Sequence, residues 1–346
     1  MPAAAGPLGR PVLRVGLQPA PAPGAVEYGC HTPPRVRMSS AIRATAWGVV
    51  AAGVAAPLVR RHVRAPPLAL QAAAFSAPVA LCVALRRTRM RDVATCALQM
   101  WAYIYAYKGP HDDPDTQAAR VHVDYPIVLD RILGLGQLPT VRLQRALARG
   151  DRWTVLDRVL VWAHWSWFLV PHGTIVYLLM RRPDSFVRAA VMTYAVFDLG
   201  ASVYWVAPTA PPWYAATLDD RVQHDPEVRR MMVEYGEFFW RDGWGPLYSV
   251  LGGNPLAAMP SLHFATSLMA ATLLAESGPV AGAAGWAYAL TLGFALVYLG
   301  EHYVADLVGG AALALGVRRA GPRAAPVLSR IGRAVASLEA KAHGAA

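Results

Sequence analysis

Apolar stretches long enough to cross a lipid bilayer recur along the whole of this chain. A transmembrane helix needs about 20 consecutive, mostly apolar residues, and several of the stretches reach or approach that length. The eight stretches occupy residues 44–59, 66–85, 93–107, 155–179, 187–206, 260–275, 280–299 and 303–317. The sequence therefore predicts an all-α fold, a polytopic transmembrane helical bundle.

The composition supports this class and excludes others. Hydrophobic residues make up 55% of the 346-residue chain and charged residues 16%, whereas a soluble domain carries about 25% charged residues. The net charge of +11 comes almost entirely from arginine, because Lys108 and Lys341 are the only lysines. There is no basic patch with interleaved aromatic residues, so we expect no nucleic-acid partner. Cys30, Cys82 and Cys96 form no CxxC pair, so we expect neither a disulfide framework nor a metal site.

The chain divides into four parts by composition. Residues 1–40 are rich in Pro, Ala and Gly, which is typical of a disordered tail. Met38 is an alternative start, in which case the residues before it are not translated. Residues 41–92 hold the first two apolar stretches and are predicted to form an N-terminal transmembrane hairpin. A membrane domain follows over 93–320, and residues 321–346 are predicted to form a cytoplasmic C-terminal tail.

Arginine-rich loops orient the bundle. The loops at 86–91, 181–188 and 318–323 alternate so that they lie on one side, which the positive-inside rule makes cytoplasmic. The segment "RRHVR" at 60–64 falls on the opposite side, so the first hairpin is re-entrant or the number of spans differs.

This orientation places three segments outside. Residues 108–154 carry apolar residues at helical spacing beside arginines, which predicts a helix lying in the plane of the membrane surface. The long loop 207–259 and the short junction around "GEHY" are the other two. His263 and His302 therefore both lie at the outer surface, each at the start of a descending helix.

The spacing of these residues suits group transfer. His302 and Asp306 are four residues apart, so a helix places them on one face. A carboxylate bonded to one ring nitrogen leaves the other nucleophilic, and His263 could then protonate the departing alkoxide. Pro260 and Ser261 suit a helix N-terminus, which binds phosphate well. The pattern predicts a phosphoryl-transfer site at the membrane surface.

Each of these features also has a purely structural explanation. An interfacial histidine can be an amphipathic boundary residue, a His-Asp pair can be a structural hydrogen bond, and Pro-Ser can be a simple helix cap. His164 and His172, eight residues apart in one stretch, are expected to bond neighbouring helices rather than a metal, with contact between His164 and the substrate pocket as an alternative. The shared position of His263 and His302 on one face favours the functional interpretation.

Three segments resemble a known family. "PSLH" at 260–263, "YLGEHYVADLVGG" at 298–310 and "APPWY" at 210–214 resemble the type-2 phosphatidic acid phosphatase superfamily. The resemblance is nearest to the branch that contains inositol phosphorylceramide synthase and related inositol phosphotransferases.

The resemblance implies a fold and a mechanism. The fold is a six-helix phosphatase-like core, here the catalytic domain 93–320, with one or two extra N-terminal helices. The mechanism uses a phosphohistidine intermediate and no cofactor, with His302 as nucleophile, Asp306 as its orienting carboxylate and His263 as acid. Further residues are expected to bind phosphate or substrate: Ser261, Leu262, Tyr298, Tyr303, Pro211, Pro212, Trp213, Tyr214, Arg221 and Arg152.

The sequence also departs from the family pattern. The phosphatase families carry a lysine–arginine motif and a Ser-Arg pair ahead of the last histidine, whereas Ala295 and Leu296 stand at the latter positions here. Other cations must therefore balance the phosphate charge. The candidates in the outer segments are Arg131, Arg142, Arg145, Arg152, Arg221 and Arg241.

Three functions remain open from sequence. The first is a lipid phosphotransferase that moves a group from a membrane phospholipid donor to an alcohol or lipid acceptor. The second is a lipid phosphate phosphatase, in which water replaces the acceptor. The third is a non-enzymatic transporter or scaffold. The expected location is the plasma membrane, with several spans, an extracytoplasmic active site and a cytoplasmic C-terminus.

Overall fold

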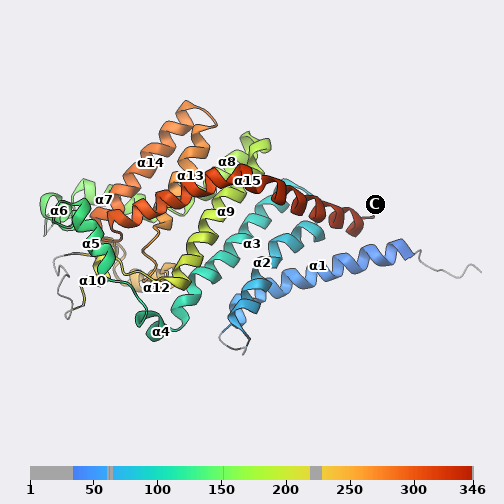
Figure 1. Cartoon of the computed structure of the whole chain (residues 1–346), viewed down its shortest axis with the longest axis horizontal. Coiled ribbons are helices and arrows are strands. Elements are labelled where there is room, and N and C mark those ends of the chain that lie inside the picture. Colours follow the sequence, from blue (N-terminus) through green and yellow to red (C-terminus); the bar gives the residue numbers. More distant parts are fainter. Residues whose placement is uncertain (1–33, 61, 63–64, 151, 219–227, 345–346) are drawn as a thin grey trace, which may run out of the picture.

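The computed structural model describes residues 34–60, 62, 65–150, 152–218 and 228–344, and every regular element in these ranges is a helix (Figure 1). The all-α prediction is therefore confirmed. The α-helices are α1 (Pro34–Val59), α2 (Pro67–Ala84), α3 (Arg89–Lys108), α4 (Pro114–Ala118), α5 (Asp124–Leu133), α6 (Pro139–Leu147), α7 (Val155–Trp165), α8 (Leu169–Arg181), α9 (Pro183–Val206), α10 (Pro212–Ala215), α11 (Met231–Trp240), α12 (Trp244–Leu251), α13 (Leu262–Ala275), α14 (Pro279–Tyr298) and α15 (Val304–Ala342). Two 3₁₀ turns, η1 (Gly109–Asp112) and η2 (Arg241–Gly243), join some of them.

Among the described residues, four helices are long and apolar enough to cross a membrane. They are α1 from Ser39 onward, α2, α9 and α14, and the apolar helix α13 is shorter. The eight apolar stretches of the sequence correspond to α1, α2, α3, the α7–α8 pair, α9, α13, α14 and α15. The protein is a polytopic helical membrane protein, as the sequence predicts.

The N-terminal hairpin consists of two helices of spanning length. Its turn meets η1, because the Arg60 Nε lies 2.6 Å from Asp112 Oδ2. This ion pair neutralises Arg60, which belongs to the segment "RRHVR" that does not fit the positive-inside rule. At the other end, α15 continues through the predicted tail to Ala342, which packs against Ala46 and Ala84 of the hairpin.

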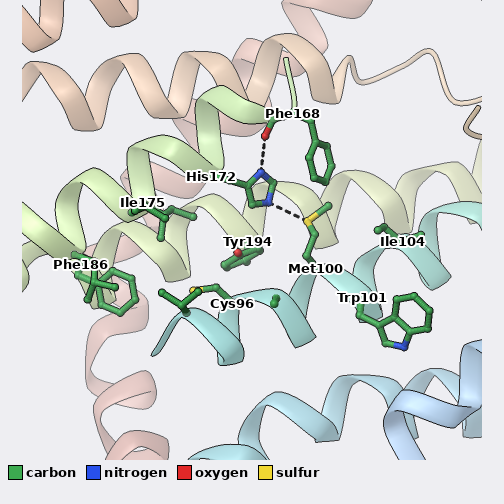
Figure 2. A pocket seen from close by; sticks show the side chains of 13 residues that line it. Cys96, Met100, Trp101, Ile104, Phe168, His172, Ile175, Phe186 and Tyr194 are labelled. Atoms are coloured by element: carbon green, nitrogen blue, oxygen red, sulfur yellow. Dashed lines mark hydrogen bonds between the residues drawn. The ribbon is translucent and has the colours of Figure 1, made fainter. Parts of the chain in front are cut away.

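The stretch predicted as one span over 155–179 is broken into α7 and α8. Pro171 has no backbone N–H and its ring crowds the carbonyl of Trp167, four residues before it, which disfavours a continuous helix here, and the break falls between Trp165 and Leu169. His172 follows the break. Its Nδ1 lies 2.8 Å from the Phe168 carbonyl oxygen and its Nε2 lies 3.1 Å from the Met100 sulfur, which ties α8 to α3 (Figure 2).

An apolar groove of about 380 Å³ lies between α3, α8 and α9 (Figure 2). Its walls include Met100, Ile104, Phe168, Ile175 and Val176. One of its walls, α9, is long and apolar enough to cross a membrane.

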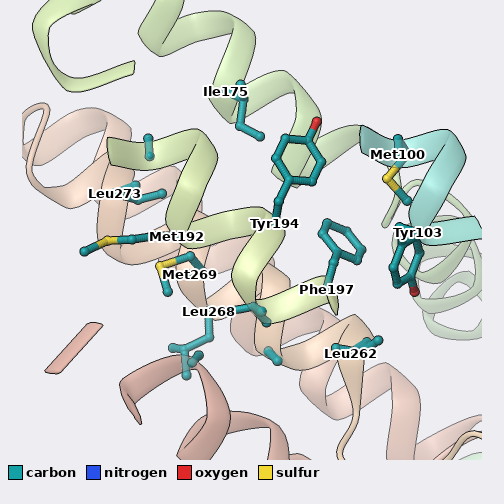
Figure 3. Close-up of a cluster of buried hydrophobic side chains, with 14 of the residues drawn as sticks. Met100, Tyr103, Ile175, Met192, Tyr194, Phe197, Leu262, Leu268, Met269 and Leu273 are labelled. Carbon is teal, nitrogen blue, oxygen red and sulfur yellow. The ribbon is translucent and has the colours of Figure 1, made fainter. Parts of the chain in front are cut away.

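The main core lies beside this groove and joins α3, α8, α9 and α13 (Figure 3). Phe197 and Met269 are fully buried in it, and the Tyr103 ring packs edge-on against Phe197 with 4.7 Å between ring centroids. Leu262 also belongs to this core. A Cβ on Gly200 of α9 would lie 2.3 Å from the Leu262 side chain, so the glycine allows α9 and α13 to pack closely.

Short helices cover one end of the bundle. There α5, α6, α10 and α12 gather around the points where α9 ends and α13 and α15 begin (Figure 1). Helix α5 buries Ile127 and Asp130 but exposes Val128, Leu129 and Ile132. An apolar outer face of this kind suits a helix lying in the membrane surface.

Candidate active site

The first site histidine begins a helix. Ser261 is the N-cap of α13, and its Oγ accepts a hydrogen bond from the Phe264 N–H at 3.3 Å. This bond satisfies one of the N–H groups that a helix start leaves without an intrahelical partner. His263 therefore sits in the first turn of α13, and the hydroxyl of Ser261 serves as the cap.

The second histidine lies in a tight turn between α14 and α15, residues 299–303, which we name the His302 turn. The Leu296 carbonyl oxygen accepts the N–H groups of both Glu301 and His302, each at 3.0 Å. Gly300 has a φ of +82°, which favours glycine. A Cβ at this position would also lie 2.4 Å from the Arg229 carbonyl oxygen.

Three side chains form a hydrogen-bonded line at this end of the bundle. His302 Nδ1 lies 3.2 Å from Asp306 Oδ2, and His302 Nε2 lies 3.3 Å from His263 Nδ1. His302 is 4% exposed and Asp306 fully buried. The hydrogen-bond network assigns the proton of His302 to Nδ1, where Asp306 accepts it. The lone pair on His302 Nε2 then points toward His263. The arrangement presents one oriented nucleophilic nitrogen beside one proton carrier.

Backbone contacts hold the starts of α13 and α15 together. The Ser261 N–H donates to the Asp306 carbonyl oxygen at 3.0 Å. A Cβ on Gly310 would lie 2.5 Å from the Ser261 carbonyl oxygen, so this close approach requires glycine. The Tyr204 hydroxyl donates to the Pro260 carbonyl oxygen at 2.6 Å and ties α9 to the same junction.

Aromatic rings enclose His263. His164 stacks on it with 5.1 Å between ring centroids, and the centroid of Trp167 lies 4.2 Å away. Both ring nitrogens of His164 are buried, and neither has a hydrogen-bond partner among the described residues. The structure therefore places the His164 ring directly against His263.

Arg230 lies beside the His302 turn, and the sequence did not single it out. Its Nε is 3.0 Å from Glu301 Oε1, and its guanidinium lies 3.7 Å from the centre of the Trp213 ring. Burial alone would lower the pKa of Arg230, but Glu301 raises it above its ordinary value, so the side chain stays cationic. The Trp213 N–H donates to the Gly300 carbonyl oxygen at 3.2 Å, which links "APPWY" to the turn.

Other predicted cations lie in different surroundings. Arg142 donates to the Gly134 carbonyl oxygen at 2.8 Å and closes the end of α5. Arg152 is exposed, and its backbone forms an isolated β-bridge with Arg149 in the connection between α6 and α7. Arg221 falls outside the described residues.

The remaining predicted binding residues lie in different surroundings. The Tyr298 hydroxyl donates to Asp157 Oδ1 at 2.5 Å. Tyr303 is buried against α5 and α6, while Tyr214 is half-buried at their edge. Pro211 and Pro212 are buried at the start of α10, and Leu262 faces the core rather than the histidines.

In the part of the chain that the structure describes, no group of three His, Cys, Asp or Glu residues is arranged for a metal ion.

Asp130 of α5 is a further buried acid next to the site. Its Oδ1 accepts the N–H of Ala305, in the first turn of α15, at 2.8 Å. Burial raises the pKa of Asp130 to about 6. No motif marks this residue in the sequence, because its partner is 175 residues away.

A comparison with known protein families matches the part of the chain that contains the site. Residues 128–319 match the model of the PAP2 superfamily, which is more than half of the 346-residue chain. The chain belongs to the PAP2 superfamily. This result confirms the resemblance that "PSLH" and "YLGEHYVADLVGG" carry.

Two curated relatives of this PAP2 protein have names that refer to inositol and ceramide. It is 28% identical over 180 residues to the inositol phosphorylceramide synthase catalytic subunit aur1 of Schizosaccharomyces pombe, covering 47% of this chain and 39% of that protein. It is 26% identical over 175 residues to the phosphoinositol dihydroceramide synthase of Bacteroides thetaiotaomicron, covering 47% of this chain and 54% of that protein. The aligned region is thus about half of these relatives or less. None of the solved structures matches the chain.

The raised pKa of Asp130 predicts a pH dependence of stability. The unfolded carboxyl releases its proton near 3.8 and the folded one near 6. The folded state therefore binds more protons between these values, and the free energy of unfolding falls as the pH rises from about 4 to about 6. We expect Asp130→Asn to remove this part of the slope in thermal unfolding in detergent. Parallel pH profiles for wild type and variant would contradict the assignment.

Proposed function

We propose that this protein is a lipid phosphotransferase that works through a phosphohistidine on His302. The observation that carries the proposal is the line from Asp306 through His302 to His263. A buried carboxylate on Nδ1 supports the positive charge that the ring acquires on attack. Membership of the PAP2 superfamily favours an enzyme over a transporter or scaffold.

The reaction has two displacements at one phosphorus atom. In the first, His302 Nε2 attacks the phosphodiester of a phospholipid such as phosphatidylinositol. A nitrogen–phosphorus bond forms, the bond to the diacylglycerol oxygen breaks, and protonated His263 gives its proton to that oxygen. In the second, His263 takes the proton of an acceptor hydroxyl, whose oxygen attacks phosphorus and releases His302. The Nδ1 proton stays on His302 throughout, hydrogen-bonded to Asp306.

Arg230 is the cation that we assign to the phosphate oxygens. It is held beside the His302 turn by Glu301 and Trp213. Charge on the phosphoryl oxygens in the transition state needs such a partner. The N–H groups at the start of α13 add a partial positive charge near His263.

Transfer is favoured over hydrolysis by the enclosure of the histidines. His302 is almost fully buried and aromatic rings cover His263, and exclusion of water protects a reactive intermediate. The names of the two relatives, an inositol phosphorylceramide synthase subunit and a phosphoinositol dihydroceramide synthase, agree with a lipid acceptor. The lipid phosphate phosphatase remains the competing hypothesis, since it differs only in the acceptor.

The arginine-rich loops support an orientation in the plasma membrane with the site outside and the C-terminus in the cytoplasm. Helix α15 starts at the site and runs away from it (Figure 1), so the C-terminus lies at the opposite end. A cysteine placed at the exposed Gln137 should react with an impermeant thiol reagent on intact cells. Reaction only after lysis would reverse the orientation.

The test of the function follows lipid products and water-soluble inositol phosphate together. Wild type, His302→Ala and His263→Ala are incubated in detergent with inositol-labelled phosphatidylinositol and a total lipid extract, with His62→Ala as an exposed control. We expect a new labelled lipid with wild type and the control. Both site variants should lose it by roughly a hundredfold or more, because each removes a group needed for bond breaking.

Two results would change the assignment. Labelled water-soluble inositol phosphate without a new lipid would make the protein a hydrolase. Site variants as active as wild type would remove the histidines from the mechanism.

The groove between α3, α8 and α9 is the site that we assign to one hydrocarbon chain of the lipid substrate. Its lining residue Phe168 packs against Trp167, which in turn contacts His263. The apolar surface therefore continues from the groove to the reacting centre. A chain in this groove would hold its headgroup near the histidines.

Filling the groove should separate long-chain from short-chain substrates. Val176→Trp places a large ring in the groove, whereas Leu290→Trp changes an exposed position on α14 outside it. We expect only the first to raise KM for a long-chain phospholipid, by several-fold, with KM for a short-chain analogue unchanged. Equal effects of the two variants, or equal effects on both substrates, would contradict the assignment.

A further inference from the structure

The His302 turn is held from outside its own helices at both ends. One end meets α5 and the other meets α6, two consecutive short helices that we name the α5–α6 hairpin (residues 124–147). We infer that Asp130 and Gln144 are positioning residues that fix the His302 ring for reaction. The inference rests on the proposed function in that the reaction is the one assigned to His302.

Asp130 fixes the end of the turn that leads into α15. Its Oδ1 accepts the Ala305 N–H at 2.8 Å, and Ala305 directly precedes Asp306. The first N–H groups of a helix have no intrahelical partner. The Tyr303 N–H is taken by Asp306 Oδ2 at 2.9 Å, and Asp130 takes that of Ala305 from a separate helix. The orientation of Asp306, and with it that of His302, is therefore set by α5 as well as by α15.

Gln144 fixes the end of the turn that leaves α14. Its Nε2 donates to the Tyr298 carbonyl oxygen and to the Arg229 carbonyl oxygen, both at 2.9 Å. Its Oε1 accepts the Arg229 N–H, also at 2.9 Å. Tyr298 is the last residue of α14, where carbonyl groups lack helical partners. One buried amide thus joins the end of α14 to the segment that carries Arg230.

Backbone bonds complete the frame between these two points. The Leu299 carbonyl oxygen accepts the Met231 N–H at 3.1 Å, and the Gly300 carbonyl oxygen accepts the Trp213 N–H. The turn therefore moves only if the outer layer moves with it. A displacement of about 1 Å at a reacting group can reduce the rate about a hundredfold, which gives Asp130 and Gln144 a kinetic role without substrate contact.

Variants that keep or remove a single bond test the role of Asp130. Asp130→Asn keeps an oxygen that can accept the Ala305 N–H, whereas Asp130→Leu keeps the size and removes the acceptor. We expect Asp130→Leu to lower kcat roughly tenfold or more with KM within about twofold of wild type. Asp130→Asn should restore most of kcat. Thr88→Val removes the N-cap bond of α3, which lies elsewhere in the bundle, and should lower the melting temperature without changing kcat.

An isosteric change tests Gln144. Gln144→Glu places a carboxylate oxygen against two carbonyl oxygens, whereas Gln137→Glu makes the same change at an exposed position of the same hairpin. We expect only Gln144→Glu to lower kcat. If both buried variants lose no more kcat than Thr88→Val and Gln137→Glu, or if they act on KM alone, the positioning role is wrong.

A readout without turnover separates this inference from the proposed function. The rate at which diethyl pyrocarbonate modifies His302, measured by mass spectrometry relative to the exposed His62, reports the surroundings of the ring directly. We expect Asp130→Leu and Gln144→Glu to raise this ratio, even if the reaction assigned to the site is not observed. An unchanged ratio in both variants would overturn the inference whatever the enzyme catalyses.

Discussion

The hydrogen bond between the His302 ring and the buried Asp306 carboxylate is the interaction on which the site depends. A carboxylate without exposure is costly to bury unless it is bonded. Here Asp306 receives the His302 ring and the Tyr303 N–H, and it lies in the first turn of α15, where the helix dipole favours negative charge. The same bond that stabilises the carboxylate directs the free nitrogen of His302 toward His263.

Close helix packing brings the two histidines together. Gly310 lets α15 approach the start of α13, and Gly200 lets α9 approach Leu262 from the other side. The His263 and His302 rings then meet although 39 residues separate them in sequence. The outer helices add a second layer, in which Gln144 bonds the end of α14 and Asp130 bonds the start of α15, on either side of the His302 turn, and Trp213 bonds the turn itself. The membrane bundle supplies the site, and the outer layer fixes its geometry.

Local patterns made part of this arrangement predictable. The four-residue spacing of His302 and Asp306 is set by the helix itself, and Ser261 is visible as a cap because its partner lies three residues away. Hydropathy gave the helical class, but one predicted span breaks near Pro171, whose effect depends on its position within the span.

Contacts between distant segments were not predictable in the same way. Arg230 directly precedes an apolar run and resembles many other arginines of this chain, and only the fold places it beside Glu301 and Trp213. Asp130 and Gln144 bond backbone groups, which any residue type could provide, so their partners leave no trace in the sequence.

Covalent chemistry at His302 can be examined directly: wild-type protein is mixed with phosphatidylinositol, quenched within one turnover, digested and analysed by mass spectrometry. We expect an inositol phosphate adduct on His302, and product formation with the adduct on another residue, or with none, would contradict the proposed mechanism.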